Sequence, residues 1–227
     1  MKPLILLALL AATVSPARAE DAFQKAADEV MASVNGVWDK LMWVGYEDAQ
    51  WTAFEAPLTT PCGTAQPSNV PFYCPEDKRI YLGLGFFSQV AAQIPDQDVA
   101  LFVMSTVVAH EVGHHVQYLI GRGDGIDAAR TALETDGKSK PSLFLSQRFE
   151  LQADCYSGIW AHTAFQSMTP VQIKKAHEFT SILAHSFDND PNHVATHGDG
   201  DQRMHWFDTG SKGGAPTSCD TFKSVSP

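Results

Sequence analysis

An apolar run fills the first half of the segment from Asp96 to Gly121. Residues 99–104 are apolar on every side, which is typical of a helix buried in a protein core, although this run is too short to cross a bilayer. Asp96 is a suitable N-cap, and Gly121 is typical of a helix exit. Between them Gly113 is the only glycine or proline. The pattern therefore predicts a central buried helix on which the rest of the chain packs.

Other segments also show helical patterns. Apolar residues recur at spacings of three and four from 21 to 43, which predicts an amphipathic helix. A further helix is expected over about 142–165, and Thr169-Pro170-Val171-Gln172 forms a capping box that begins a helix reaching about Phe187. A polar loop at 188–192 precedes a short helix over about 199–209 that ends at Gly210.

The remaining segments predict short strands and loops. Residues 51–75 are rich in Pro, Thr and Gly and are expected to be irregular with one or two short strands, and Arg79–Leu82 reads as a strand followed by a short helix. The polar connection over 121–141 has room for a short helix at 126–134, and we expect a surface loop there in preference to a mobile flap. The predicted fold is α+β and predominantly helical, with a small antiparallel sheet in a single domain over 20–227.

The first 19 residues have the features of a secretory signal peptide. Lys2 supplies a positive n-region, residues 4–14 form an apolar h-region, and Ala17-Arg18-Ala19 is an A-x-A cleavage site. An uncleaved membrane anchor is the competing interpretation, but the apolar stretch is short for a span. We therefore expect a chain that begins at Glu20, is exported to the periplasm or secreted, and has no stable membrane insertion after cleavage.

Charge and cysteine usage narrow the class of partner and compartment. The formal net charge of −10 is spread along the chain, which argues against nucleic acid and anionic membranes as partners. Four cysteines in an exported chain predict two disulfides, and the sequence favours Cys62 with Cys74 and Cys155 with Cys219. Zinc ligation by cysteine is the rival hypothesis, but no C-x2-C spacing is present.

The predicted central helix carries His110-Glu111-Val112-Gly113-His114. Two histidines four apart lie one turn apart on one helix face, so both imidazoles can bind one zinc ion, with Glu111 beside the open position of the metal. The alternative is a pair of core histidines satisfied by hydrogen bonds. His115 is excluded as a ligand because it points about 100° away from His114.

A second pair of polar residues lies on the helix expected over 142–165. Glu150 and Asp154 are also four apart and share a face, as a metal ligand and a carboxylate supporting the site would. They could instead be surface carboxylates. The apolar neighbours Phe149, Leu151 and Ile159 weaken that alternative, because carboxylates beside a core need a cation.

Taken together, five sequence runs resemble the bacterial putative neutral zinc metallopeptidase family. The runs are Pro71 to Pro75, His110 to Gln117, Glu150 to Tyr156, Thr196-His197-Gly198 with Gln202-Arg203, and Cys219 to Phe222. The resemblance implies a zincin-like metallopeptidase domain of the glutamate-ligand kind, with zinc held by His110, His114 and Glu150 and supported by Asp154. Members of that family often begin with a membrane-spanning helix where this chain has a signal peptide.

These residues predict peptide hydrolysis. Zinc held by two imidazoles and a carboxylate keeps an open position where the pKa of water falls to about 7, and Glu111 would take the proton as general base. A peptide or protein substrate could pair with Arg79–Leu82 as an edge strand. His197 would donate to the developing oxyanion, or it would cap the following helix. The spacing from His197 to Arg203 resembles that of other zincins with a glutamate ligand, which implies a place for Arg203 in the substrate-binding wall.

Two other classes of function stay open at this point. In one, zinc is structural, in a closed site with His197 or a cysteine as fourth ligand. In the other, the chain is a pseudo-peptidase that binds envelope proteins without cutting them. Glu111 argues against both, since neither function needs a general base there.

Overall fold

The structure is a computed structural model that describes residues 16–42, 44–186 and 196–223. Most of the proposed signal peptide, residues 1–15, lies outside the described residues, as do the predicted loop at 188–192 and the predicted helix end at Phe187. The α-helices are α1 (Pro16–Met42), α2 (Leu84–Gln93), α3 (Gln97–Leu119), α4 (Arg122–Thr135), α5 (Ser139–Ala164), α6 (Pro170–His185) and α7 (Gly200–Gly213). The strands are β1 (Gln50–Phe54), β2 (Leu58–Thr60), β3 (Gly63–Ala65), β4 (Phe72–Cys74) and β5 (Arg79–Gly83).

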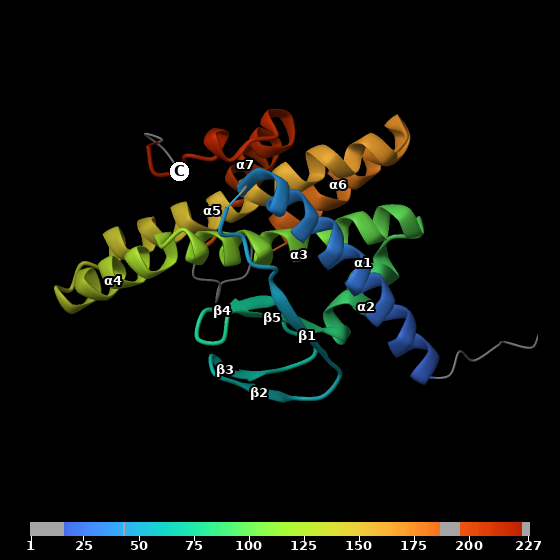
Figure 1. Ribbon diagram of the computed structural model, residues 1–227, viewed down its shortest axis with the longest axis horizontal. Helices are drawn as coiled ribbons and strands as arrows, with labels where there is room; N and C mark the ends of the chain where they lie inside the picture. Colours follow the sequence, from blue (N-terminus) through green and yellow to red (C-terminus); the bar gives the residue numbers. More distant parts are fainter. Residues whose placement is uncertain (1–15, 43, 187–195, 224–227) are drawn as a thin grey trace, which may run out of the picture.

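Helix α3 is the centre of the molecule, as the apolar pattern predicts. The strands gather on one side of α3, and α5, α6 and α7 lie on the other (Figure 1). Val99, Val103 and Val112 are almost completely buried along it. The helix is long and apolar enough to cross a membrane, but 83% of that stretch is buried inside the fold. Its apolar character is therefore explained by its place in the core.

Side chains cap the N-termini of three helices, α3, α6 and α7. The Asp96 carboxylate accepts from the backbone N–H of Val99 at the start of α3. Thr169 and Gln172 form the predicted capping box of α6. Asp199 and Gln202 form a second capping box at the start of α7. These caps satisfy backbone N–H groups that have no partner within the helix.

The small sheet is mixed, and it corrects one prediction. The strand order is β1-β5-β4, with β5 parallel to β1 and antiparallel to β4, while β2 and β3 form a separate antiparallel pair. Strand β5 is therefore central, and the interpretation of Arg79–Leu82 as an edge strand was wrong because both of its backbone edges are already paired. Residues 51–75 also hold more strands than expected.

The connection after α3 is more helical than the sequence suggests. Helix α4 covers 122–135, where we expected a surface loop with a short helix at 126–134. Gly121 takes a left-handed conformation (φ 72°), which turns the chain between α3 and α4. Helix α4 then packs against α5.

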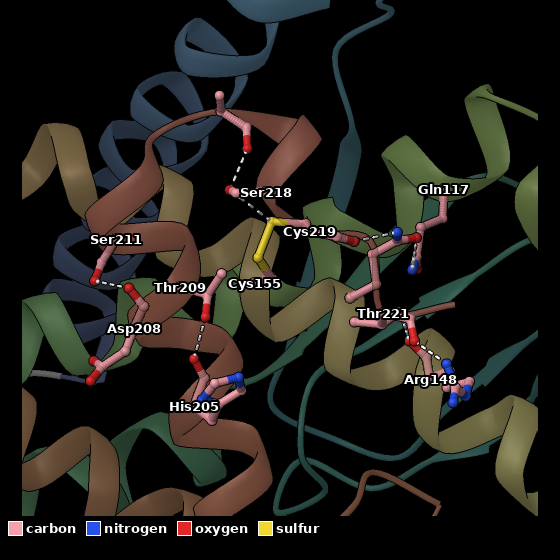
Figure 2. The surroundings of a disulfide bond; sticks show 12 residues. Gln117, Arg148, Cys155, His205, Asp208, Thr209, Ser211, Ser218, Cys219 and Thr221 are labelled. Carbon is pink, nitrogen blue, oxygen red and sulfur yellow. Dashed lines mark hydrogen bonds between the residues drawn. A yellow bond between two sulfur atoms is a disulfide. The ribbon is translucent and has the colours of Figure 1, made fainter. Parts of the chain in front are cut away.

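Both predicted disulfides are present. Cys62 pairs with Cys74 beside β4, and Cys155 pairs with Cys219, which ties α5 to a segment 64 residues further along the chain. Figure 2 shows the second bond with Arg148 and Thr221 close by. The Arg148 guanidinium donates to the carbonyl of Thr221, and the Thr221 hydroxyl donates to the carbonyl of Arg148 (2.7 Å). Segment 219–221 is thus held to α5 both covalently and by hydrogen bonds.

Helices α5 and α7 approach each other through residues that have no side chain. A Cβ atom on Gly158 would overlap the carbonyl oxygen of Phe207, and one on Gly210 would overlap the carbonyl oxygen of Cys155. The two backbones can therefore lie in direct contact only while both positions are glycine. This contact determines how closely α7 packs against α5.

We predict that Gly158→Ala lowers the free energy of unfolding by about 1–3 kcal/mol, because the added methyl group must push α7 away from α5. Gly36→Ala on α1 is the matched control, since nothing lies within 4 Å of a Cβ at that position. The control is expected to be neutral, or to stabilise by about 0.5–1 kcal/mol through the better helix propensity of alanine. Urea denaturation of both variants measures the difference, and equal effects would contradict the packing account.

Removal of either disulfide should destabilise the fold by about 2–4 kcal/mol, and the Cys155–Cys219 bond should matter more because it closes the longer loop. Cys155→Ala/Cys219→Ala and Cys62→Ala/Cys74→Ala are compared by thermal unfolding without reductant. A larger loss in the second variant would overturn the predicted order. Mass mapping of the unreduced chain checks the pairing itself.

Candidate metal centre

Helices α3 and α5 run antiparallel and bring two imidazoles against one carboxylate. The Nε2 atoms of His110 and His114 each lie 3.2 Å from the same oxygen, Oε2 of Glu150. The ligand atoms of these three residues all lie within 4.8 Å of one another. All three side chains are largely buried, Glu150 being the most exposed at 18%. The sequence motif and the downstream carboxylate therefore meet at one point.

The outer nitrogens of both imidazoles are held by hydrogen-bond acceptors. Nδ1 of His110 lies 2.9 Å from Oδ1 of Asp154, and Nδ1 of His114 lies 2.9 Å from Oε1 of Gln117. The Gln117 amide nitrogen donates to the carbonyl of Phe149 (2.8 Å), which fixes its oxygen toward His114. Both imidazoles are therefore expected to carry a proton on Nδ1.

This arrangement leaves two Nε2 lone pairs directed at a carboxylate oxygen. Three acceptors at 3.2 Å repel one another unless a cation, either protons on the rings or a metal ion, lies among them. Zinc in proteins is commonly bound by two imidazole nitrogens and one carboxylate oxygen, with the Nδ1 atom of each imidazole hydrogen-bonded to a further acceptor. The residues present thus fit a zinc ion held by His110, His114 and Glu150.

The pKa values reflect how strongly this cluster attracts positive charge. Burial lowers the pKa of His110, but Asp154 and Glu150 outweigh burial and raise it to about 10. Burial raises the pKa of Glu150, but His114 and His197 outweigh burial and hold it well below its usual range. A metal ion that binds here would take the place of protons on the rings.

Asp154 joins His110 to the guanidinium of Arg203, whose side chain is 18% exposed. Its two oxygens accept from Nε and Nη2 of Arg203, both at 2.9 Å, while Oδ1 also faces Nδ1 of His110. Burial raises the pKa of Asp154, but Arg203 and His110 outweigh burial and keep it below its ordinary value. Arg203, which we had assigned to the substrate-binding wall, is therefore a partner of Asp154 that also lines the cavity.

A chain of amides supports His114 from behind, and sequence reasoning missed it. The Gln117 amide nitrogen also donates to Oε1 of Gln152 (3.1 Å), and Gln152 donates to the carbonyl of Cys219 (2.8 Å). Gln117 and Gln152 are buried. The spacing of Gln117, three residues after His114 and so on the same helix face, is the signal that could have identified it.

Glu111 lies beside the candidate ligands without joining their group. It is 95% buried, and it lines the same cavity as Tyr73 of β4. Burial raises the pKa of Glu111, although His110 and His114 act in the opposite direction. A carboxylate with a raised pKa is better suited to accept a proton than one at its ordinary value.

His197 lies at the same point from a third direction. Its Nε2 is 3.2 Å from Oε2 of Glu150, its Nδ1 is 2.9 Å from the Thr196 hydroxyl, and its ring lies over that of His110. Burial lowers its pKa to about 4, which keeps the ring neutral at neutral pH. The hypothesis that His197 caps α7 was wrong, because Asp199 is the N-cap.

The other histidines near the motif point elsewhere. His115 faces the hydroxyl of Tyr73 (3.3 Å) and the carbonyl of Glu47 (2.7 Å), as its position on the helix predicts. His177 and His185 are partly exposed and pair with Asp208 and Asp201 of α7. None of these three lines the cavity that contains the candidate ligands.

A cavity of about 480 Å³ contains the candidate ligands. Residues 70–73, which include the start of β4, form one wall, and the rest is formed by His197 and by residues of α2, α3, α5, α6 and α7. This volume lies in the range of clefts that bury small ligands, roughly 300–1,000 Å³. His110, Glu111, His114, Glu150 and His197 all line it.

This donor set and cavity are those expected of a zinc metallopeptidase. The chain belongs to the family described as putative neutral zinc metallopeptidase, which it matches over residues 9–222. The resemblance inferred from the five sequence runs is therefore confirmed. No solved structure matches the chain.

Two bacterial relatives illustrate the family. The uncharacterized protein YpfJ of Escherichia coli K12 is 31% identical over 220 residues, which cover 89% of this chain and 72% of the relative. The uncharacterized protein Rv2575 of Mycobacterium tuberculosis H37Rv is 32% identical over 211 residues, which cover 85% of this chain and 68% of the relative. The similarity thus extends well beyond the histidine motif.

Zinc affinity should fall in a defined order when the carboxylates of α5 are removed. Glu150→Ala removes a ligand oxygen and is expected to lower the affinity sharply, whereas Asp154→Ala removes a support of His110 and should lower it by about 10- to 100-fold. Competition titrations with a chromogenic chelator measure both values. Unchanged zinc retention in Glu150→Ala would exclude Glu150 as a ligand and direct the search to His197, whose Nε2 lies 3.2 Å from Oε2 of Glu150.

Proposed function

We propose that the protein is an exported zinc-dependent endopeptidase that hydrolyses peptide bonds. The observation that carries the proposal is the set of His110, His114 and Glu150, with both imidazoles oriented by hydrogen bonds, in a cavity that also contains a buried carboxylate, Glu111. A purely structural zinc site does not require such a carboxylate or an adjoining cavity. The proposed substrate is a peptide or protein.

Zinc, when bound, supplies Lewis acidity that polarises a carbonyl group and lowers the pKa of water to about 7. Glu111 takes the proton of the attacking water and passes it to the leaving amine. Glu111 lines the cavity, and burial keeps the proton affinity of its carboxylate high. Asp154 and Gln117 keep the imidazole rings in the orientation that presents Nε2.

Strand β4, and not Arg79–Leu82, is the proposed strand with which an extended substrate pairs. Among the described strands β4 pairs only with β5, so its other edge can accept an extended peptide. Val70, Phe72 and Tyr73 line the cavity, which puts that edge beside Glu111. A peptide that extends the sheet here would run past the metal ligands.

His197 is the proposed donor to the oxyanion that develops on the substrate carbonyl. Its neutral ring has Nε2 inside the cavity and 3.2 Å from Glu150, and it comes from outside the metal-binding helix. A preorganised donor of this kind stabilises the transition state more than the ground state. The same proximity to Glu150 also fits His197 as a fourth zinc ligand. The zinc affinity of a His197 variant distinguishes the two roles.

Export to the periplasm or the extracellular space is part of the proposal. It is supported by the signal-like features of residues 1–19 and by the two disulfides, which persist in oxidising compartments. The disulfides also remove one alternative, because no free cysteine remains to act as a fourth zinc ligand. A closed site with His197 and a pseudo-peptidase that binds without cutting are the alternatives that the experiments below address.

Glu111→Gln is expected to retain zinc while peptide hydrolysis falls by 10² or more. The amide keeps the size of the side chain but cannot take the proton of the attacking water. Zinc content and hydrolysis of a fluorogenic peptide library are measured for the variant and the parent, each with and without a chelator. Parent protein that holds zinc but does not hydrolyse any peptide would favour the non-catalytic alternatives, and full activity in the variant would remove the role given to Glu111.

His197→Ala should lower kcat by about 10² to 10³ with little change in KM, because it removes a donor used in the transition state. Zinc affinity and thermal stability should stay near those of the parent. His177→Ala is the control, since His177 pairs with Asp208 outside the cavity and should leave kcat unchanged. Loss of zinc from His197→Ala would identify a fourth ligand and would overturn the open-site mechanism.

A further inference from the structure

The cavity continues beyond the candidate metal ligands along α3. The antiparallel register of α3 and α5 is visible in three contacts: His114 beside Glu150, His110 beside Asp154, and the Thr106 carbonyl accepting from the Ser157 hydroxyl (2.7 Å). Thr106, Val107 and Ser157 also line the cavity. The cavity therefore extends about one helical turn toward the N-terminus of α3, past the last polar ligand.

This second end of the cavity is mainly apolar, although the hydroxyl-bearing residues Thr106, Ser157 and Thr180 also line it. It is lined by Phe86 from α2, Val107 from α3, Leu183 and Ala184 from α6, and Met204 and Phe207 from α7. None of the described residues that line this end carries a charge, whereas the metal end contains Glu111, Glu150, Asp154 and Arg203. The mechanism proposed above uses only the charged end, so the apolar end is left without a role.

The distance between the two ends matches that from a peptide carbonyl to an adjacent side chain. Val107 precedes His110 by three residues, which corresponds to about 4.5 Å along the helix axis. A carbonyl held at the metal end would therefore have the side chain of the residue next to it at the apolar end. The cavity, about 480 Å³ in all, has room for a large side chain in addition to the reacting peptide group.

We infer that the apolar end is a specificity pocket for one large apolar side chain, such as that of Leu or Phe, on a residue directly flanking the scissile bond. This inference rests on the proposed peptidase function and names its substrate class. Burial of the side chain there removes it from water, and a single methylene group in such a pocket changes kcat/KM by about 10- to 200-fold. A Lys or Asp side chain would lose its hydration without gaining an oppositely charged partner and is excluded.

Ala184 and Leu183 allow the pocket to be narrowed and widened from the same helix. Ala184 is 93% buried and lines the cavity, so Ala184→Leu places three additional carbon atoms in it. Leu183→Ala removes three carbon atoms from the same wall. Ala128→Leu on α4 is the matched control, because it makes the same chemical change at an exposed position outside the cavity.

The experiment uses short blocked peptides with a single variable residue, Leu, Phe, Ala, Lys or Asp, and maps each cleavage by mass spectrometry. The zinc-loaded parent is expected to cleave beside Leu or Phe at least about 10-fold more efficiently than beside Ala, with no cleavage directed by Lys or Asp. Ala184→Leu should bring the ratio for Phe over Ala close to one, Leu183→Ala should raise the ratio for Phe over Leu, and Ala128→Leu should change neither ratio. Thermal unfolding identifies any variant that has lost its fold.

Binding of the same peptides to zinc-loaded Glu111→Gln, measured by calorimetry, separates this inference from the proposed function. Efficient cleavage without a preference for Leu or Phe, or with a preference that neither pocket variant changes, would overturn the pocket and leave the peptidase intact. The parent could instead fail to cleave any peptide while binding those with Leu or Phe most tightly. If Ala184→Leu also weakens that preference, the result would support the pocket and overturn the peptidase. Absence of both cleavage and selective binding would overturn the pocket as well.

Discussion

The close approach of three helix backbones is the constraint on which the site depends. Gly113 of α3 faces the backbone of Ala153 on α5, where an added Cβ would lie 3.2 Å from the Ala153 Cα. Gly158 and Gly210 bring α5 and α7 into backbone contact. An aspartate side chain is short, so Asp154 can touch both His110 and Arg203 only because α3 and α7 lie this close to α5. Helix packing and site geometry are therefore parts of one arrangement.

The buried charges of the site depend on one another in the same way. Glu150 faces three imidazoles, and Asp154 faces one imidazole and one guanidinium. Each charge would be costly to bury alone, and each is stabilised by a neighbour that is itself stabilised by another. A bound cation would add positive charge beside the Glu150 carboxylate, where the two imidazole Nε2 atoms meet it. The cluster thus holds its members in place by electrostatics as well as by packing.

The features that could be predicted from the sequence are those set by local spacing. The four-residue spacing of His110 and His114 and the capping box at Thr169 depend on helix geometry alone, and the structure reproduces both helices. The central position of β5 depends on pairing with β1, a strand in a segment that we expected to be mostly irregular. Pairing of distant strands leaves little signal in a single strand, which explains the wrong assignment of the sheet edge.

The supporting residues were harder to predict than the candidate ligands. Asp154 was expected from its spacing to Glu150, but its contact with Arg203 required the position of α7, which only the folded chain supplies. Gln152 is polar and buried because it meets a backbone carbonyl 67 residues away. A glutamine of this kind has no local pattern that separates it from a surface residue.

Because residues 219–221 are attached to α5, the framework of the site can be completed only after these residues have been synthesised. Cys219 is synthesised 64 residues after Cys155, and Thr221 follows it. These two residues provide the disulfide partner of α5, the acceptor of Gln152 and the partners of Arg148. A nascent chain that already contains every candidate metal ligand still lacks this support behind His114. Synthesis of the metal-binding residues therefore precedes completion of their framework, and oxidation of Cys155 with Cys219 comes later still.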